Sequence, residues 1–197
     1  TLHLRMHAGA GISYGNSQTS MPYDYSFFGG GSNDNRGWRA RALGPGAYKY
    51  HLDTSRLATQ IGDIRFGGAL EYRFEISSTF KGAIFTDFGN IWTYREDASR
   101  LGSQFNWQTF VPQLAISSGV GLRMDLEFFI LRLDVGFPIF DPAFADGARW
   151  VFQDFKTRET YYQEGMQHFN MTLDQVKEIM PRPFLPNYLN FGIGYPF

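Results

Sequence analysis

Residues 64–76 read IRFGGALEYRFEI, and the alternation in this stretch decides the fold class. The even positions are apolar apart from Gly68, whereas the odd positions include two arginines and two glutamates. Successive side chains of a β-strand point to opposite faces of a sheet. The stretch is therefore predicted to be a strand with one apolar face and one charged face.

Five further stretches alternate in the same way, although 81–92 does so less cleanly: 2–12, 81–92, 114–125, 128–139 and 189–197. About ten residues is the length with which a tilted strand crosses a bilayer. The connections at 77–78 and 125–128 are short, whereas 15–63, 94–112 and 141–187 are long. Short turns on one side and long loops on the other are typical of outer-membrane barrels, with the C-terminal end on the short-turn, periplasmic side. We predict an all-β, antiparallel transmembrane β-barrel, with 1–197 as part of one barrel domain.

The composition fits this prediction and excludes several other classes. The chain has 197 residues, 18% aromatic residues, a net charge of −1 and no cysteine. Disulfide frameworks and thiolate metal sites are therefore excluded, and a broad electrostatic grip on nucleic acid is not expected. No apolar run is long enough for a spanning helix. Barrel strands are not detected by mean hydropathy, however, because apolar and polar residues alternate along them.

A soluble β-sandwich also alternates, and two features favour the barrel over it. The polar face carries charges of both signs mixed with glycine, as expected of a lumen. The apolar face ends in aromatic residues that suit an interfacial girdle: Tyr72, Phe74, Trp92, Tyr195 and Phe197. Two roles are open to the charged positions on this face: they can form ladders of cross-strand pairs, or they can simply keep the lumen solvated and fix the register, which is the role that we expect for most of them. These positions are Arg65, Glu71, Arg73, Glu75, Asp87, Arg123, Asp125, Arg132 and Asp134.

Catalytic motifs are missing from the sequence. His3 and His7 share a strand face but lie about 13 Å apart at strand rise, too far to share a metal ion. No nucleophile elbow, zinc-protease motif or phosphate-binding loop is present. We therefore expect neither an enzyme nor a cofactor. The only helix that we predict is 172–180, which has a Thr172 cap and ends at Pro181, within an extracellular loop insertion at 141–187.

The longest connection contains an unusual stretch, GGGSNDNRGWR, at 29–39. Its Arg-Gly-aromatic triplet resembles the loop signature of the BamA/TamA superfamily of outer-membrane assembly and translocation barrels. The resemblance continues in order through 67–76, 80–92 with its Phe85, Asp87 and Gly89 element, 117–125, 131–139 and 190–197. The terminal GYPF, together with the 141–187 insertion, resembles Bacteroidetes members of that family.

The resemblance implies a role for the triplet Arg36, Gly37 and Trp38. In that family the loop folds back into the lumen, so Arg36 is expected to meet Asp87 on the inner wall, with Glu71 as a second acidic neighbour. Glycines let the backbone turn tightly in a crowded interior, and Trp38 is expected to pack against the wall. We interpret the arginine as an anchor that positions the loop.

The resemblance also implies an architecture and a function. A family barrel has sixteen strands preceded by periplasmic POTRA domains, so the chain is interpreted as the C-terminal part of a longer protein. A small barrel of about eight strands is the alternative. The whole protein would insert β-barrels into the bacterial outer membrane or move polypeptide across it. A passive pore or a surface adhesin remains the competing function.

The expected partners are outer-membrane lipid and client β-barrel polypeptides, with accessory lipoproteins or surface partners at 141–187 and no nucleic acid. The last strand would form one side of a lateral seam through Phe191, Ile193, Tyr195 and Phe197. An aromatic ending of this kind is also the assembly signal of any outer-membrane barrel.

Overall fold

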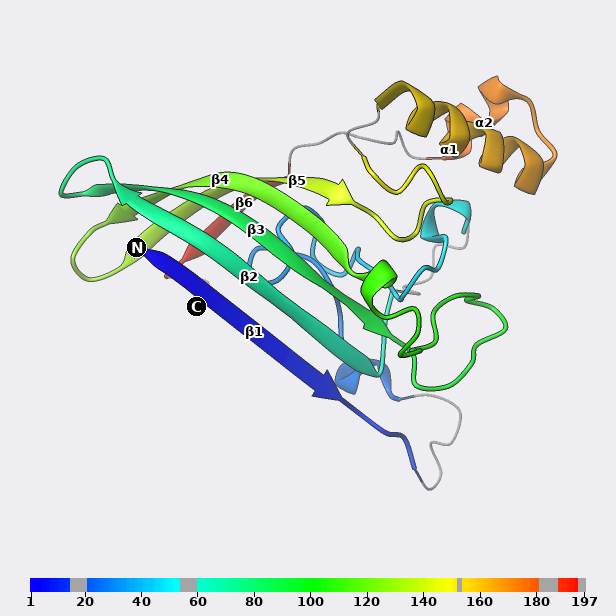
Figure 1. Ribbon diagram of the computed structural model, residues 1–197, viewed down its shortest axis with the longest axis horizontal. Helices are drawn as coiled ribbons and strands as arrows, with labels where there is room; N and C mark the ends of the chain where they lie inside the picture. The colour runs from blue at the N-terminus through cyan, green and yellow to red at the C-terminus, as the bar shows by residue number, and fades with distance from the viewer. Residues whose placement is uncertain (15–20, 54–59, 152–153, 181–187, 195–197) are drawn as a thin grey trace.

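Six antiparallel strands form one curved sheet in chain order in the computed structural model, which describes residues 1–14, 21–53, 60–151, 154–180 and 188–194 (Figure 1). The strands are β1 Leu2–Ala10, β2 Ile64–Glu75, β3 Phe80–Trp92, β4 Ala115–Asp125, β5 Ile130–Phe140 and β6 Tyr188–Ile193. Each strand pairs with its neighbours in sequence, and the sheet is not closed: among the described residues, β1 and β6 have a partner strand on one side only.

Short helices and two α-helices lie in the connections. The 3-10 helices are η1 Tyr23–Tyr25, η2 Tyr50–Leu52 and η3 Val111–Gln113, and the α-helices are α1 Asp154–Phe169 and α2 Leu173–Ile179. Within the described part of the chain, none of the helices has the length and apolar character needed to cross a membrane.

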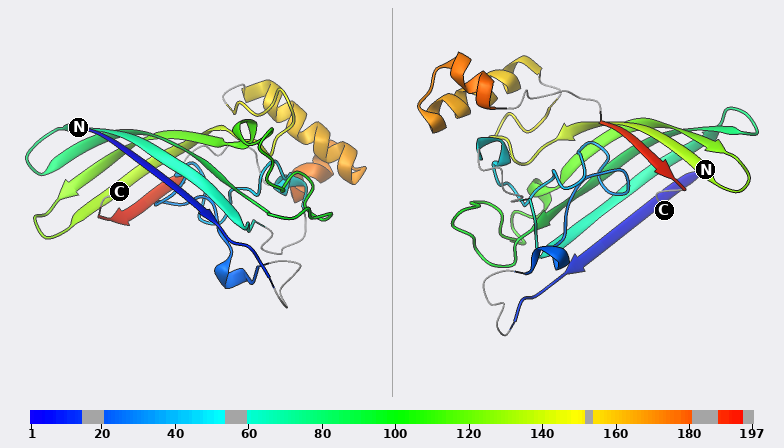
Figure 2. Two further views of the ribbon diagram at one scale, coloured as in Figure 1. Left: turned by 60° about the horizontal axis from the view of Figure 1, so that its bottom comes forward. Right: turned by 180° about the vertical axis from the view of Figure 1, so that it is seen from behind.

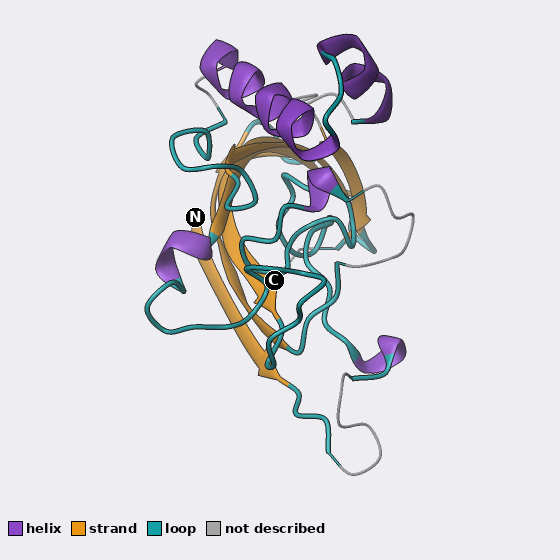
Figure 3. Ribbon diagram, turned by 90° about the vertical axis from the view of Figure 1, so that its right-hand side faces the viewer, coloured by secondary structure: helices purple, strands orange, loops and turns teal. Residues whose placement is uncertain are grey.

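The long connections all leave from one end of the sheet. Figures 1 and 2 show the segments after β1, β3 and β5 at this end, whereas the tight turns after β2 and β4 lie at the other end. The first long connection is described over 11–14, 21–53 and 60–63, and its part around 33–37 lies over the concave face, inside the curve of the sheet (Figure 3). Strand positions and this division of loops agree with the prediction from alternation.

The two faces of the sheet are the reverse of those in a soluble protein, because the apolar side chains are exposed and the charged side chains are buried. Leu4 on β1 is 65% exposed and Leu70 on β2 is 43% exposed, whereas Glu71 and Asp87 on the concave face are fully buried. The convex apolar face would be costly in water but is the natural surface toward lipid. A β-sandwich would place a second sheet against that apolar face; the single sheet of the described residues instead covers its polar face with a loop.

The prediction about the helices of the loops was incomplete. Helix α2 lies where expected, and the Gln175 side-chain oxygen accepts a hydrogen bond of 3.0 Å from the Thr172 backbone N–H. Helix α1 was missed, so the insertion holds two helices rather than one. Gly165 lowers the helix propensity of this segment, but it lies where α2 packs: an added Cβ would be 2.2 Å from Met180 Sδ. Tertiary packing, which a local pattern cannot reveal, stabilises α1.

Trp92 does not belong to an exposed girdle. Its side chain is fully buried, and its indole Nε1 donates a hydrogen bond of 2.7 Å to Gln113 Oε1. The connection between β3 and β4 folds back and covers it with Phe105 and Phe110, whose rings lie 5.6 and 5.3 Å from the indole. The last strand ends at Ile193, and Tyr195 and Phe197 lie outside the described residues.

If the convex face contacts lipid, Leu70→Arg in the middle of β2 should lower the free energy of unfolding by about 2–4 kcal/mol, the cost of arginine near the midplane of a bilayer. The measurement is urea unfolding of the intact protein in lipid vesicles. Tyr14→Arg is the matched control, because Tyr14 lies outside the strands and is 86% exposed. Equal tolerance of the two substitutions would show that this face meets water.

Candidate functional site

Five consecutive residues of the long loop, 33–37, contact every strand of the sheet. On β1 and β2, Arg5 donates to the Asn33 carbonyl at 2.7 Å, and Arg65 lies 2.9 Å from Asp34. On β4, the Ser117 hydroxyl donates a hydrogen bond to Asn35 Oδ1 and accepts one from the Gly37 N–H. Arg36 forms ion pairs with Asp87 on β3 and with Asp134 on β5. On β6, Asn190 Nδ2 donates to the Arg36 carbonyl at 3.0 Å. The loop therefore cross-links the whole wall at one level.

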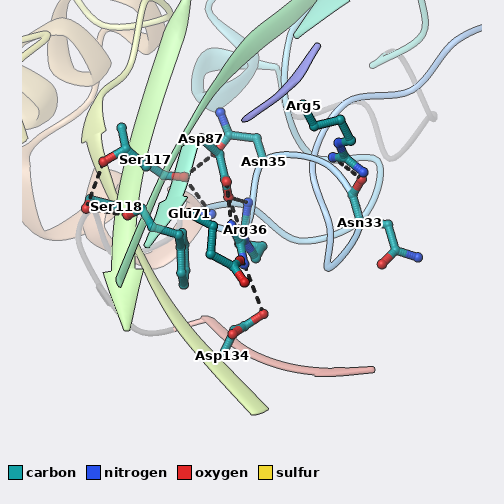
Figure 4. A network of polar contacts seen from close by, with 12 residues as sticks. Arg5, Asn33, Asn35, Arg36, Glu71, Asp87, Ser117, Ser118 and Asp134 are labelled. Atoms are coloured by element: carbon teal, nitrogen blue, oxygen red, sulfur yellow. Dashed lines mark hydrogen bonds and ion pairs between the residues drawn. The ribbon is translucent and has the colours of Figure 1, made fainter. Parts of the chain in front are cut away.

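Arg36 is the centre of these contacts and is 1% exposed (Figure 4). Its Nε and Nη2 donate to the two carboxylate oxygens of Asp87 at 2.8 and 2.7 Å, which is the bidentate arrangement that a guanidinium favours. Its Nη1 donates to Glu71 Oε2 at 2.7 Å and to Asp134 Oδ2 at 3.2 Å. Its own backbone N–H also donates to Asp87, at 3.0 Å. The guanidinium carbon lies 3.4 Å from the centre of the Phe85 ring, within cation–π range.

Three further arginines complete a buried charge cluster around these carboxylates. Arg73 Nε lies 2.6 Å and Arg123 Nη2 3.0 Å from Glu71, and Arg132 Nε lies 3.2 Å from Asp134, which Arg123 also contacts. Burial of so many charges costs desolvation, and only complete pairing offsets that cost. The cluster is therefore better suited to fixing the position of the loop than to adding net stability.

Cross-strand pairing accounts for only part of the charged face: Arg123 on β4 meets Asp134 on the adjacent β5, but other charges pair in different ways. Glu71 on β2 meets Arg123 on β4, two strands away, because the curvature of the sheet turns their side chains toward a common centre. Arg65 pairs with loop residue Asp34, and Glu75 is exposed. Lys81 and Asp125, on adjacent strands, do form a pair at 3.2 Å.

Asp34 forms a second anchor in the same loop. Its carboxylate lies 2.9 Å from Arg65 and 3.3 Å from His7, and it accepts a 2.7 Å bond from the Gly30 N–H. Burial alone would raise the pKa of Asp34, but His7, Arg65 and the Gly30 N–H hold that pKa at about 2. The carboxylate is therefore charged at any physiological pH.

Two glycines allow the loop backbone to touch the wall. A Cβ on Gly37 would lie 2.4 Å from Ser117 Cβ and 3.0 Å from the Pro138 nitrogen. A Cβ on Gly136, on β5, would lie 2.3 Å from the Arg36 carbonyl oxygen. Neither space can hold a methyl group without displacement of backbone, so both glycines are needed for the close approach that brings Arg36 to its partners.

The structure brings together Arg36, Gly37, Asp87 and Glu71, and it packs Trp38, which is 4% exposed, against Leu43 and Ala115. Phe191 and Ile193 do not join this site: they are 59% and 72% exposed on the outer face of β6. Sequence reasoning missed the following members of the site: Asn33, Asp34, Asn35, Ser117, Gly136 and Asn190. The alternation placed Ser117, Gly136 and Asn190 on the polar face, but it could not show which part of that face the loop would meet.

In the part of the chain that the structure describes, no group of three or more His, Asp or Glu side chains is placed to hold a metal ion. The carboxylates are saturated by arginine. The site is therefore arranged to hold a loop in place.

A sheet with a lipid-suited exterior, a charged interior and a loop anchored inside defines the wall of a membrane β-barrel. The sequence model of the Omp85 superfamily domain matches residues 1–165, and the chain belongs to this superfamily. It is thus part of a non-enzymatic β-barrel of the bacterial outer membrane, in a superfamily that includes outer-membrane protein assembly and translocation factors. The match does not identify the bacterial phylum, so the resemblance to Bacteroidetes members stays a prediction. No curated protein matches the chain significantly.

Arg36→Ala should lower the free energy of unfolding of the intact barrel by about 3–5 kcal/mol, because it leaves buried carboxylates without their cation. Arg36→Lys should recover only part of this loss, since an ammonium cannot reproduce the bidentate fork. Denaturant unfolding in detergent measures both. Arg39→Ala, in the same loop but at an exposed position, is the control; an equal effect at both positions would contradict the anchor.

Gly37→Ala and Gly136→Ala should each destabilise the barrel and release the loop from the wall, because their methyl groups would meet backbone. Limited proteolysis within 11–63 and the unfolding midpoint are the measurements. Gly147→Ala is the control: that glycine has a φ of +87° but open space around it, so only a conformational cost of about 1 kcal/mol is expected. Resistance to protease equal to that of the unmodified protein would show that the close approach is dispensable.

Proposed function

We propose that the chain is the C-terminal wall of a sixteen-stranded barrel that inserts β-barrel proteins into the outer membrane or moves polypeptide across it. The observation that carries this proposal is the contact of loop residues 33–37 with all six strands. A loop held this firmly inside the wall blocks passive flow, and it makes the six strands one mechanical unit.

The free edges of the sheet support a role in templating. Unpaired backbone N–H and C=O groups are intolerable in lipid, so other strands must cover the outer edges of β1 and β6 in the membrane. An edge that opens exposes a row of backbone groups to which a client strand can pair. Because the anchored wall resists deformation, we place the opening at its edge rather than within it.

The β6 edge is the better side for such a seam. Within the described residues this strand has six residues and six paired positions with β5, over 131–136, followed by one more backbone bond of 2.7 Å from the Gly194 N–H to the Ile130 carbonyl. The other neighbouring strands have nine to twelve paired positions. Gly192 lies within it and Gly194 directly follows it, and glycine weakens a strand. We propose Phe191 and Ile193 as seam residues, together with Tyr195 and Phe197 of the terminal segment.

We propose that the 141–187 insertion is an extracellular cap with a surface for accessory partners. Its helices share a core in which Phe144, Tyr161, Val176 and Met180 are buried. It is tied to the first loop by Glu164, whose carboxylate lies 2.7 Å from Lys49 and 3.3 Å from His51. These contacts link the cap to the connection that carries Arg36.

The test measures two activities of the intact protein in the same lipid vesicles: ion conductance, and the rate at which an added unfolded β-barrel client reaches its folded, heat-modifiable form. We expect low conductance and faster client folding than in empty vesicles. Arg36→Ala should raise conductance and slow client folding, because the loop and the wall lose their common anchor, whereas Arg39→Ala should change neither.

A steady open-pore conductance without any acceleration of client folding would contradict the proposal and favour a passive barrel. Low conductance without acceleration would reject the insertase function while leaving the plugged lumen intact.

A further inference from the structure

The connection between β3 and β4 forms a fixed ledge on the outer side of the wall. Figure 3 shows η3 and the loop beside it on the convex side of the sheet, opposite the loop that fills the interior. Its backbone is held at both ends: Thr93 N–H donates to Ser103 O and Phe105 N–H to Thr93 O, both at 2.9 Å, and Asn90 Nδ2 donates to Gln113 O at 2.6 Å. The exposed side chains of this ledge are therefore presented in a defined position.

Aromatic rings join the ledge to the lipid-suited face of the sheet. Phe66, on the outer face of β2, lies 6.2 Å from Phe88 of β3 and 5.2 Å from Phe110 of the loop, measured between ring centres. Phe110 in turn lies 5.7 Å from Phe105 and 6.3 Å from Trp107. We use the name aromatic ledge for Phe105, Trp107, Phe110 and Val111. The apolar exterior of the strands thus continues onto the loop without interruption.

The ledge is far more apolar than a loop surrounded by water should be. Trp107 is 82% exposed and Val111 69% exposed. No Asp, Glu, Lys or Arg occurs between Arg100 and Arg123. A large exposed indole next to other apolar side chains is a liability in water, but it is favoured where headgroups meet hydrocarbon.

The height of the ledge agrees with a membrane interface. Phe74, near the turn at the other end of β2, is 40% exposed and marks the opposite rim of the apolar face. Eight residues of β2 separate Phe74 from Phe66, which is roughly 26 Å along the strand and roughly 20 Å along the membrane normal at a tilt of about 40°. An outer-membrane barrel has an apolar band about 25 Å tall. Phe110 lies against Phe66, at the far end of β2 from Phe74, and Trp107 is its neighbour on the ledge, so the ledge falls near the level where the second interface is expected.

We propose that the aromatic ledge is a membrane-interface anchor that rests among the lipid headgroups at the long-loop end of the barrel. Its occupant is lipid rather than a partner protein, because the ledge is continuous with the lipid-facing strands and shares their lack of charge. In this position the ledge belongs to the aromatic girdle at the membrane interface. The alternation had assigned Trp92 to that girdle, but Phe105 and Phe110 of the ledge bury the Trp92 side chain. The anchor would set the height of the β3–β4 region in the bilayer.

The test uses the fluorescence of Trp107 in the intact protein, reconstituted in dioleoylphosphatidylcholine vesicles. Trp150, which is 50% exposed, is first replaced by phenylalanine, and the signal of Trp107 is the difference between Trp150→Phe and the double variant Trp107→Phe/Trp150→Phe. Phosphatidylcholines brominated close to the headgroup or near the chain end, and iodide in the buffer, serve as quenchers. We expect the largest loss of Trp107 emission with the shallow bromolipid, a smaller loss with the deep one and little with iodide.

Strong quenching by iodide with none by either bromolipid would place Trp107 in water and overturn the proposal, leaving a protein partner as the better occupant. A second comparison does not depend on fluorescence: Val111→Glu should slow folding into these vesicles more than Leu173→Glu, which replaces an exposed apolar residue of the cap. Equal folding rates of these two variants would also count against the anchor. Neither result bears on the insertase function, since neither assay involves a client.

Discussion

The contact between Arg36 and Asp87 is the constraint on which the rest of this wall depends. A bidentate pair with both side chains at most 1% exposed fixes the distance and orientation of the loop relative to β3. From that point the neighbours of Arg36 reach the other strands, and Gly37 and Gly136 supply the space that the contact requires. Without the pair, the buried carboxylates on three strands would lose the positive charge of Arg36 that offsets their mutual repulsion. The loop would then lose the contact that holds it against the concave face.

The same constraint explains why polar groups make up so much of the interior, beside the apolar contacts of Trp38 and Phe85. In lipid, an apolar exterior carries no penalty, so the apolar face of the strands turns outward and a mainly polar face is left to hold the loop. Specific hydrogen bonds and ion pairs must do this, and they are directional, which ties the loop to one register. The result is a rigid wall whose weaker place is its β6 edge.

Much of this was visible in the sequence, for a physical reason. A barrel strand must alternate, because one face meets lipid and the other a charged lumen. The strand ranges followed from that rule to within a few residues, and the predicted end of the last strand, 195–197, lies outside the described residues. The meeting of Arg36 with Asp87 and Glu71 followed from a family resemblance, whereas Asp134 and Asn190 join them only because the sheet curves. Helix α1 and the burial of Trp92 depend on contacts between distant segments, which no local periodicity contains.

A double-mutant cycle between Arg36 and Asp87 tests the central claim most directly. The free energy of unfolding of the intact barrel would be measured for Arg36→Ala, Asp87→Ala and the double variant. If the pair anchors the loop, the loss in the double variant should be smaller than the sum of the single losses by more than about 1 kcal/mol, as expected for residues in direct contact. Losses that add to within about 0.5 kcal/mol would show that the two residues act independently, and would contradict this account of the wall.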